Sequence, residues 1–299
     1  MHDDNYFEIG TSHEVCQDYA LSGQINEHIS YAIISDGCTM SHKACGQVDL
    51  GARILVHAAK NCVKRIWQKA TTIDVPEGID SFEAVNDYIR EHAIRLTRII
   101  EKQLELSDLF ADCTLLIAVA DKNGKAISFM YGDGSVYVKM KSGIEHVIDV
   151  SFTSGAPLYL SYHTDPARAQ AYMEQFGRMP VFIEEYGVTD LTAAKEKEIG
   201  AFKSNFIYAT DQKVYEMAMR VWENVELISV TSDGAKSFLR HVENEYTPVP
   251  YLDIMAEFHA YKNKNGIFVQ RRMKAMGKNH SKDGITHYDD ISVAAIITD

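Results

Sequence analysis

Three short segments of the sequence place an aspartate just after a run of apolar residues. They read IISDG at 33–37, FMYGDG at 129–134 and ISVTSDG at 228–234. The runs are short and rich in β-branched and aromatic residues, a composition that predicts strands. A carboxylate at a strand end is held by the sheet yet open to solvent, and the glycine after it permits a positive φ and close backbone approach. We therefore expect Asp36, Asp133 and Asp233 at the ends of strands.

Two further segments add carboxylates to this set. Asp18 opens one apolar segment, and the pair Asp289–Asp290 precedes ISVAAIIT at 291–298. Any one Asp-Gly pair by itself usually marks a turn. Five oxygen-donating segments without His or Cys partners instead suit hard cations such as Mg²⁺ or Mn²⁺. Two such ions about 3.5–4 Å apart would activate a water for in-line attack on a phosphate ester. The set therefore favours a metal-dependent phosphatase.

The order of the remaining elements favours an α+β sandwich over a doubly wound fold. Strands are followed by two long helices, more strands, a helical region and a last strand. All 299 residues are expected to form one domain, in which about 150–225 is hard to read and could be a flap or an insertion. The expected strands are 6–9, 18–21, 29–35, 113–120, 125–132, 135–141, 225–234 and 291–298, and the expected helices are 46–69, 81–100, 166–176 and a region through 236–276.

Composition narrows the partners and the setting. The formal net charge of −12 makes nucleic acid a poor partner, because phosphate backbones would be repelled. The five cysteines are odd in number and form no CxxC pair, which argues against a disulfide framework and a structural zinc. The N-terminus lacks a signal-peptide pattern, and no stretch reaches the ~18 apolar residues of a membrane span. We expect a cytoplasmic protein that binds neither nucleic acid nor membrane.

Taken in order, six segments resemble the motifs of the PPM (type 2C) serine/threonine phosphatases. The segment HEVCQD at 13–18 stands where the family has Arg-x-x-Asn-Glu/Gln-Asp. The other five, with the family motif each resembles, are SDG at 35–37 (V-A-D-G), DCTLLIAV at 112–119 (G-S-T-A), GDGSVYV at 132–138 (G-D-S-R-x-Y), TSDGAKSF at 231–238 (S-D-G-L) and DDISVAAI at 289–296 (D-N/D-I-T-V). Each motif is weak alone, but together they cover residues 6 to 298 in the family's order.

The resemblance implies a fold, a cofactor and a set of ligands. The fold is a four-layer αββα sandwich of two packed antiparallel sheets flanked by helix pairs. The cofactor is two Mg²⁺ or Mn²⁺ ions, with a third at a weaker site. Asp36 would bridge the two ions and Gly37 would offer its carbonyl. Asp233 and Asp289 would complete one site, Asp18 would ligate or orient metal-bound water, and Asp133 would hold the third ion. A phosphorylated protein is the implied substrate.

The phosphate-binding half of the family's site matches less well. His13 stands where the family has its phosphate-binding Arg, and imidazole does not replace a bidentate guanidinium without loss. Lys43 or Arg53 could supply a cation instead, and His13 could be an ordinary surface histidine. His42 could be the general acid for the leaving oxygen, or a loop histidine without a role.

These departures keep alternatives open. A pseudophosphatase would retain the fold and bind a partner without catalysis, and a small phosphorylated metabolite could replace the protein substrate. The sequence does not indicate the oligomeric state.

Overall fold

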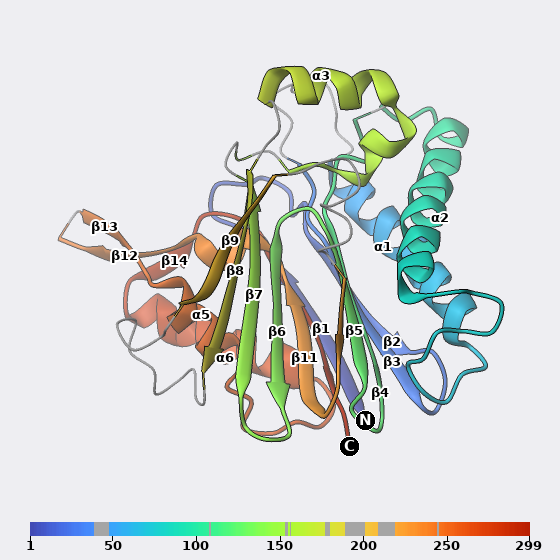
Figure 1. Ribbon diagram of the computed structural model, residues 1–299. Coiled ribbons are helices and arrows are strands. Elements are labelled where there is room, and N and C mark those ends of the chain that lie inside the picture. Colours follow the sequence, from blue (N-terminus) through green and yellow to red (C-terminus); the bar gives the residue numbers. More distant parts are fainter. Residues whose placement is uncertain are drawn as a thin grey trace.

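A computed structural model describes residues 1–38, 48–107, 109–152, 155, 157–176, 180–188, 201–208, 219–243 and 245–299. Strands and helices alternate in blocks along this chain (Figure 1). The strands are β1 His2–Glu8, β2 Tyr19–Gln24, β3 Ile29–Ser35, β4 Leu115–Asp121, β5 Ala126–Tyr131, β6 Gly134–Met140, β7 Glu145–Phe152, β8 Pro180–Val188, β9 Ala201–Tyr208, β10 Met219–Trp222, β11 Val225–Thr231, β12 Phe238–Val242, β13 Glu245–Pro248, β14 Ile285–His287 and β15 Ile291–Ile297. The α-helices are α1 Val48–Trp67, α2 Phe82–Gln103, α3 Pro166–Phe176, α5 Tyr251–His259 and α6 Phe268–Lys282, and the 3-10 helices are η1 Leu160–Thr164 and η2 Asp233–Lys236.

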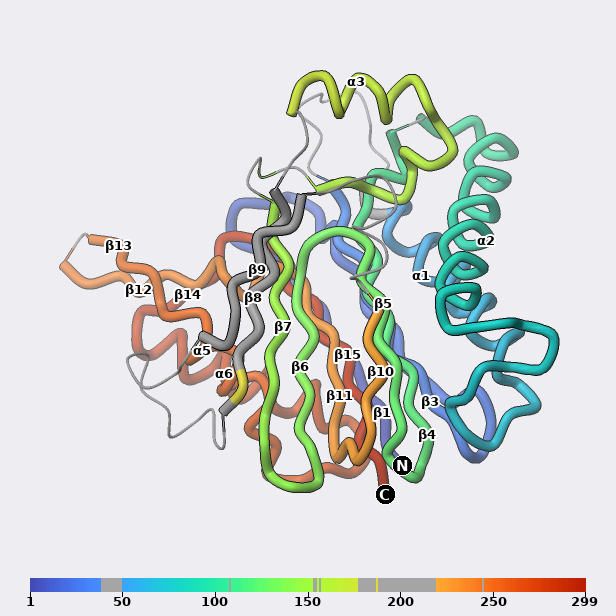
Figure 2. Tube along the Cα trace, viewed as in Figure 1, coloured from blue at the N-terminus to red at the C-terminus, as the bar shows by residue number. Residues whose placement is uncertain are grey.

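Two antiparallel sheets form the centre of the molecule. One sheet has the strand order β1-β15-β11-β6-β7-β8-β9 and the other β10-β5-β4-β3-β2. Figure 2 shows them facing each other, with α1 and α2 beyond one sheet and α5 and α6 beyond the other. The strands read as apolar runs because both faces of each sheet are covered, so β3, β4 and β5 are buried at every position. This arrangement confirms the predicted sandwich of two antiparallel sheets with flanking helices.

Three apolar cores separate these layers. The first packs α1 and α2 on the five-stranded sheet and includes the buried Trp67 and Phe129. The second lies between the sheets, where alanines such as Ala32 and Ala118 meet larger side chains such as Ile228. The third packs α5 and α6 on the seven-stranded sheet around Phe258 and Met273. Burial of these faces is the main stabilising contribution to the sandwich.

One predicted segment differs from the structure. The helical region expected through 236–276 contains two strands, β12 and β13, before α5 and α6 begin. The two strands and β14 form a separate three-stranded sheet, and β13 is exposed at every residue. An exposed hairpin lacks the apolar alternation that marks a half-buried strand, so its sequence pattern does not reveal it. β1 also begins at His2, earlier than the predicted strand.

Part of the segment 150–225 is now placed. β8 and β9 extend the seven-stranded sheet beyond β7, and β10 pairs with β5 at the edge of the other sheet. Helix α3 is confirmed at the predicted residues and lies above one end of the sheets in Figure 1. That this segment is a flap or an insertion stays a prediction.

Candidate metal and phosphate site

The register of β2 against β3 places Asp18 and Asp36 beside each other. Tyr19 pairs with Ser35, so Asp18 before β2 and Asp36 after β3 lie at the same end of the five-stranded sheet. Two hydrogen bonds to Thr114 hold the Asp36 backbone: its N–H donates to Oγ1 at 3.1 Å, and its carbonyl accepts from the Thr114 N–H at 2.8 Å. The next residue, Gly37, forms an isolated antiparallel bridge with Cys113. This backbone is therefore fixed before any ligand binds.

Asp133 and Asp233 come from the matching end of the seven-stranded sheet. Asp133 lies between Gly132 and Gly134, whose φ angles of +107° and +126° turn the chain sharply from β5 into β6. Asp233 begins η2 directly after β11, and Thr231 pairs with Ser135 of β6. The predicted positive φ thus occurs at Gly134. At Gly234 the need is for space, because an added Cβ would lie 1.8 Å from the carbonyl oxygen of Asp290.

The pair Asp289–Asp290 divides into an anchor and an open carboxylate. The Asp290 carboxylate is 1% exposed and accepts the N–H groups of Gly10 (2.7 Å) and Gln17 (2.6 Å). It therefore ties the β1–β2 connection to the start of β15. The Asp289 carboxylate is 35% exposed and accepts the N–H of Asp290 at 2.9 Å. Of this pair, Asp289 has the side chain that remains partly exposed.

Strong electrostatic interaction shows that four aspartates from both sheets gather here. Burial, and then the charges of Asp18 and Asp233 and further Asp133, raise the pKa of Asp36 well above its usual value. Burial raises the pKa of Asp18 to about 7. Burial, followed by the charge of Asp233, also raises the pKa of Asp133 to about 7. Because carboxylates this close destabilise one another's charged forms, the cluster favours binding of protons or a cation.

Asp289 lies at the edge of this cluster. Burial and then the charge of Asp233 raise the pKa of its carboxyl group. The structure therefore brings Asp18, Asp36, Asp133 and Asp233 within electrostatic range of one another, and Asp289 within range of Asp233. Their individual roles as metal ligands stay a prediction.

The residues of the cluster fit a hard divalent cation. Both carboxylate oxygens of Asp18 and Oδ1 of Asp233 are buried, and no residue that the structure describes gives them a hydrogen-bond donor at bonding geometry, although the hydroxyl groups of Ser232 and Ser292 lie near Asp18. Buried oxygens of this kind require a counter-charge or a proton. Within the described residues, no three His, Cys, Asp or Glu side chains are already arranged as a metal-binding group.

Of the two histidines predicted to belong to the site, the structure describes His13. The side chain of His13 is 15% exposed, with Nδ1 3.0 Å from Asp290 Oδ1 and Nε2 3.7 Å from Asp289 Oδ1. This geometry sets the imidazole beside the Asp289 carboxylate, and it is not an ordinary surface histidine. A direct contact of His13 with phosphate stays a prediction. His42 and Lys43 lie outside the described residues.

One cation near the cluster was missed by the sequence analysis. Lys236, three residues after Asp233, places its Nζ 2.7 Å from Asp149 Oδ2 and 5.7 Å from the ring centre of Tyr251. Burial alone would lower the pKa of Lys236, but the charges of Asp149, Asp233 and Asp133 outweigh it and raise this pKa. The lysine in TSDGAK was the only sequence signal, because its partner Asp149 belongs to β7. Arg53 instead stacks on Tyr19, with 4.9 Å between Cζ and the ring centre.

Tyr159 is a second missed residue. Its pKa is raised by burial, then by Cys38 and by the charges of Asp133 and Asp36, so the hydroxyl group lies near the cluster. It precedes η1, in the stretch that the sequence left hard to read. A phenol kept neutral in this way can donate a hydrogen bond to an oxyanion.

Comparison with known proteins identifies the class that this fold and site define. The sequence model of the protein phosphatase 2C family matches residues 9–276. Because this match spans most of the chain, the chain belongs to the protein phosphatase 2C family. Curated proteins give no match to the sequence.

Several solved structures are similar to the chain at low sequence identity. The serine/threonine phosphatase of S. agalactiae is 13% identical with a TM-score of 0.48, over 100% of this chain and 99% of that chain. Stp1 from Staphylococcus aureus is 9% identical with a TM-score of 0.47, over 99% and 94%. The phosphatase domain and regulatory-domain fragment of SpoIIE from Bacillus subtilis is 12% identical with a TM-score of 0.49, over 99% and 63%. These likenesses are too distant to carry an argument on substrate.

The helices give one further finding. Within the described residues, none is long and apolar enough to cross a membrane.

Proposed function

We propose that this protein is a metal-dependent phosphatase that hydrolyses phosphoserine or phosphothreonine in proteins. The observation that carries the proposal is the convergence of aspartates from both sheets at one end of the sandwich, with buried oxygens that lack a donor among the described residues. The family supplies the reaction class. A cytoplasmic location stays a prediction.

The proposed role of each residue follows the family resemblance, and the electrostatic environment of Asp36 supports its part. The charges of Asp18 and Asp233 both raise the pKa of Asp36, so Asp36 would be the ligand shared by the two ions. Gly37 would add a carbonyl oxygen, Asp233 and Asp289 would complete one site, and Asp133 would serve a third ion. When bound, Mg²⁺ or Mn²⁺ would activate a water and neutralise phosphoryl charge.

The chain's own cations and donors would handle the phosphate. His13 would orient Asp289, from which its Nε2 lies 3.7 Å. Lys236 keeps a positive charge within electrostatic range of Asp133 and Asp233, and Tyr159 offers a neutral hydroxyl group. His42 is proposed as the general acid on the evidence of the sequence alone. These residues replace the Arg clamp that the sequence lacks at position 13.

The first experiment measures turnover of p-nitrophenyl phosphate and of a phosphothreonine peptide with Mn²⁺, and Mn²⁺ affinity by calorimetry. Asp36→Asn and Asp233→Asn should each lower kcat/KM by on the order of 100-fold or more and weaken Mn²⁺ binding, because each removes an anionic ligand. Asp253→Asn on α5 is the matched control and should leave both quantities unchanged. Wild-type protein that neither turns over substrate nor binds Mn²⁺ would refute the proposal.

A binding protein without catalysis is the second candidate. It is favoured by one observation, namely that His13 stands where the family has its phosphate-binding Arg. A pseudophosphatase should bind the phosphothreonine peptide equally well with Mn²⁺ or with EDTA and should release no phosphate. Activity on small phosphate esters but not on the peptide would point to a metabolite substrate instead.

A further inference from the structure

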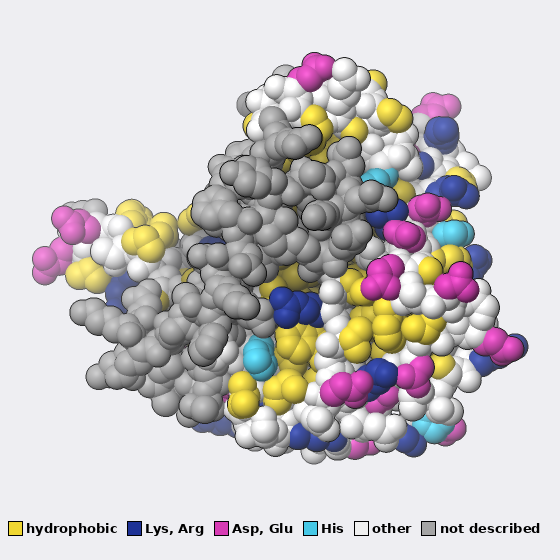
Figure 3. Space-filling view, viewed as in Figure 1, with side chains coloured by type: hydrophobic (Ala, Val, Ile, Leu, Met, Phe, Trp, Pro, Cys, Tyr) yellow, Lys and Arg dark blue, Asp and Glu magenta, His cyan; other side chains and the backbone are white. Residues whose placement is uncertain are grey.

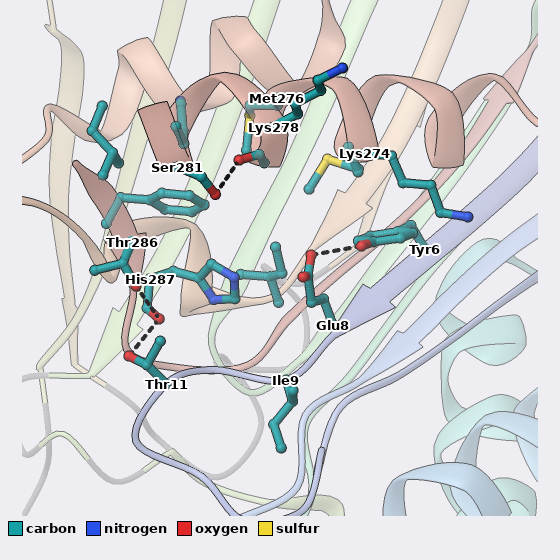
Figure 4. Close-up of a pocket in the computed structure, with 16 residues that line it drawn as sticks. Tyr6, Glu8, Ile9, Thr11, Lys274, Met276, Lys278, Ser281, Thr286 and His287 are labelled. Atoms are coloured by element: carbon teal, nitrogen blue, oxygen red, sulfur yellow. Dashed lines mark hydrogen bonds between the residues drawn. The ribbon is translucent and has the colours of Figure 1, made fainter. Parts of the chain in front are cut away.

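A cavity of about 420 Å³ lies between α6, β1 and β14, apart from the aspartate cluster. None of Asp18, Asp36, Asp133, Asp233 or Asp289 lines it. In Figure 4, α6 runs along one side, Tyr6 and Glu8 of β1 face it, and Thr286 and His287 close one end. Its volume is in the range of small-molecule sites, about 300–1,000 Å³.

The deep wall of this cavity is apolar. Phe238, Met273 and Met276 are each 2% exposed, and Ile291 is 1% exposed. These side chains belong to the third core, so the wall is held by the packing of α6 on the seven-stranded sheet. A preformed apolar wall of this kind favours a ligand with an aromatic or aliphatic body.

Lysines occupy the α6 side of the mouth. Lys274 and Lys278 both line the cavity, one helical turn apart, and Lys274 extends toward Tyr6 in Figure 4. The opposing carboxylate, Glu8, accepts a hydrogen bond from the Tyr6 hydroxyl group at 2.6 Å, and its single negative charge is outnumbered by the two lysines. In a chain with a formal charge of −12, this local excess of positive charge favours an anionic group on the ligand.

His280 adds a polar, firmly held residue to the wall. It lines the cavity and is 5% exposed, and its Nε2 lies 3.1 Å from Glu257 Oε2. Because His280 belongs to α6 and Glu257 to α5, this contact joins the two helices and fixes this part of the wall.

We propose that the cavity is a second ligand-binding site, for a small molecule with an apolar body and a carboxylate, sulfonate or phosphate group. The body would lie against Met273 and Met276, and the anion would lie near Lys274 and Lys278. The proposal does not depend on the phosphatase reaction, because the residues that line the cavity are separate from the aspartate cluster and binding is measured without turnover.

The test uses 1-anilinonaphthalene-8-sulfonate, which combines an aromatic body, an N–H donor and a sulfonate. Fluorescence titration of the full chain should show saturable binding with one site and a Kd on the order of 10–100 µM. Gly277→Leu should weaken binding by at least about ten-fold, because Gly277 lines the cavity and the side chain would fill it. The variant should fold, since an added Cβ meets nothing within 4 Å.

Ala275→Leu is the matched control, because it adds bulk to the same helix outside this cavity. It should change the Kd by less than about two-fold. Lys274→Glu with Lys278→Glu should weaken binding about ten-fold, whereas Lys262→Glu with Lys282→Glu makes the same charge change elsewhere and should weaken it far less. Circular dichroism checks that each variant is folded.

A site-specific readout separates this cavity from adventitious dye binding. With the 11 methionines ¹³C-labelled at the methyl group, the dye should shift the resonances of Met273 and Met276 and leave Met219 in place. Equal affinity of Gly277→Leu and Ala275→Leu, or shifts that avoid Met273 and Met276, would show that the dye binds elsewhere and would overturn the proposal.

Discussion

At the scale of single residues, neighbouring aspartates do different work. The Asp290 carboxylate accepts hydrogen bonds from two backbone N–H groups, whereas about one third of the Asp289 side chain is exposed. A buried carboxylate with two backbone donors is a structural group, and an exposed one beside the cluster is free to accept a ligand. We therefore predict that Asp290 serves stability and that Asp289 serves metal binding.

Matched substitutions test this separation. Asp290→Asn should lower the free energy of unfolding by about 1–3 kcal/mol, because an amide has a single acceptor oxygen and its NH₂ group would face a backbone N–H. Asp289→Asn should change stability by less than about 0.5 kcal/mol in EDTA but weaken Mn²⁺ binding. Urea unfolding and calorimetry measure the two quantities. The reverse pattern would contradict the assignment.

The raised pKa of Asp18 predicts that the free energy of unfolding of the metal-free protein depends on pH. Its pKa is about 7 in the folded state and 3.8 when unperturbed, so between these pH values the folded state holds the extra proton. The free energy of unfolding contributed by this group therefore falls as the pH rises. Asp18→Asn should match wild type near pH 4 and exceed it near pH 8, by at most about 4 kcal/mol. Urea unfolding in EDTA measures the difference, and a difference that does not change with pH would contradict it.

At the scale of elements, one glycine in each of α1 and α6 shows how closely that helix packs against its neighbours. An added Cβ at Gly51 of α1 would lie 1.9 Å from the Phe110 carbonyl oxygen and 2.9 Å from Cys113 Sγ. At Gly277 of α6 it would meet nothing within 4 Å. Helix α1 can therefore approach the residues before β4 only because position 51 lacks a side chain.

The same substitution should therefore have opposite effects in the two helices. Gly277→Ala should raise the free energy of unfolding by about 0.5–1 kcal/mol, the usual helix-propensity gain. Gly51→Ala should lower it by about 1–3 kcal/mol, because the clash with backbone outweighs that gain. Thermal unfolding of both variants beside wild type checks this, and stabilisation by Gly51→Ala would disprove the close packing.

At the scale of the whole molecule, the site depends on the spacing of the two sheets. Asp18 and Asp36 belong to one sheet, and Asp133, Asp233 and Asp289 belong to the other. Alanines such as Ala32 and Ala118 line the inner face of the five-stranded sheet, which lets the sheets approach. Figure 3 shows acidic and basic side chains interspersed on the outer surface on the α1–α2 side of the molecule. The aspartate cluster forms instead where the two sheets meet.

Overpacking between the sheets should therefore weaken a distant site. Ala118→Leu should lower the free energy of unfolding by about 1–3 kcal/mol and also weaken Mn²⁺ binding, because the carboxylates of the two sheets move apart. Ala59→Leu in the core beneath α1 adds the same volume and should destabilise similarly while preserving Mn²⁺ affinity. Equal Mn²⁺ affinities in the two folded variants would refute this dependence.

Features that depend on residues close together in sequence were predicted, whereas most features that depend on distant residues were not. The strands before Asp36 and Asp233 were predictable because apolar runs and Asp-Gly pairs are contiguous in sequence. The hairpin of β12 and β13 was not, because exposed strands lack the apolar alternation of half-buried ones, and their neighbour β14 lies far along the chain. The roles of Lys236 and Tyr159 were missed because the residues near them, such as Asp149 and Asp36, are distant in sequence.

The sequence by itself determined the class of fold and the chemical character of the site, since apolar periodicity and carboxylates at strand ends are local properties. The tertiary structure alone decided which carboxylates meet. Strand register sets Asp18 opposite Asp36, and the packing of two sheets brings Asp233 to them. Packing also left Asp289 partly exposed, buried Asp290, and formed a cavity beside α6. These features could not be predicted, because solvent exposure is a property of the packed molecule and not of the chain.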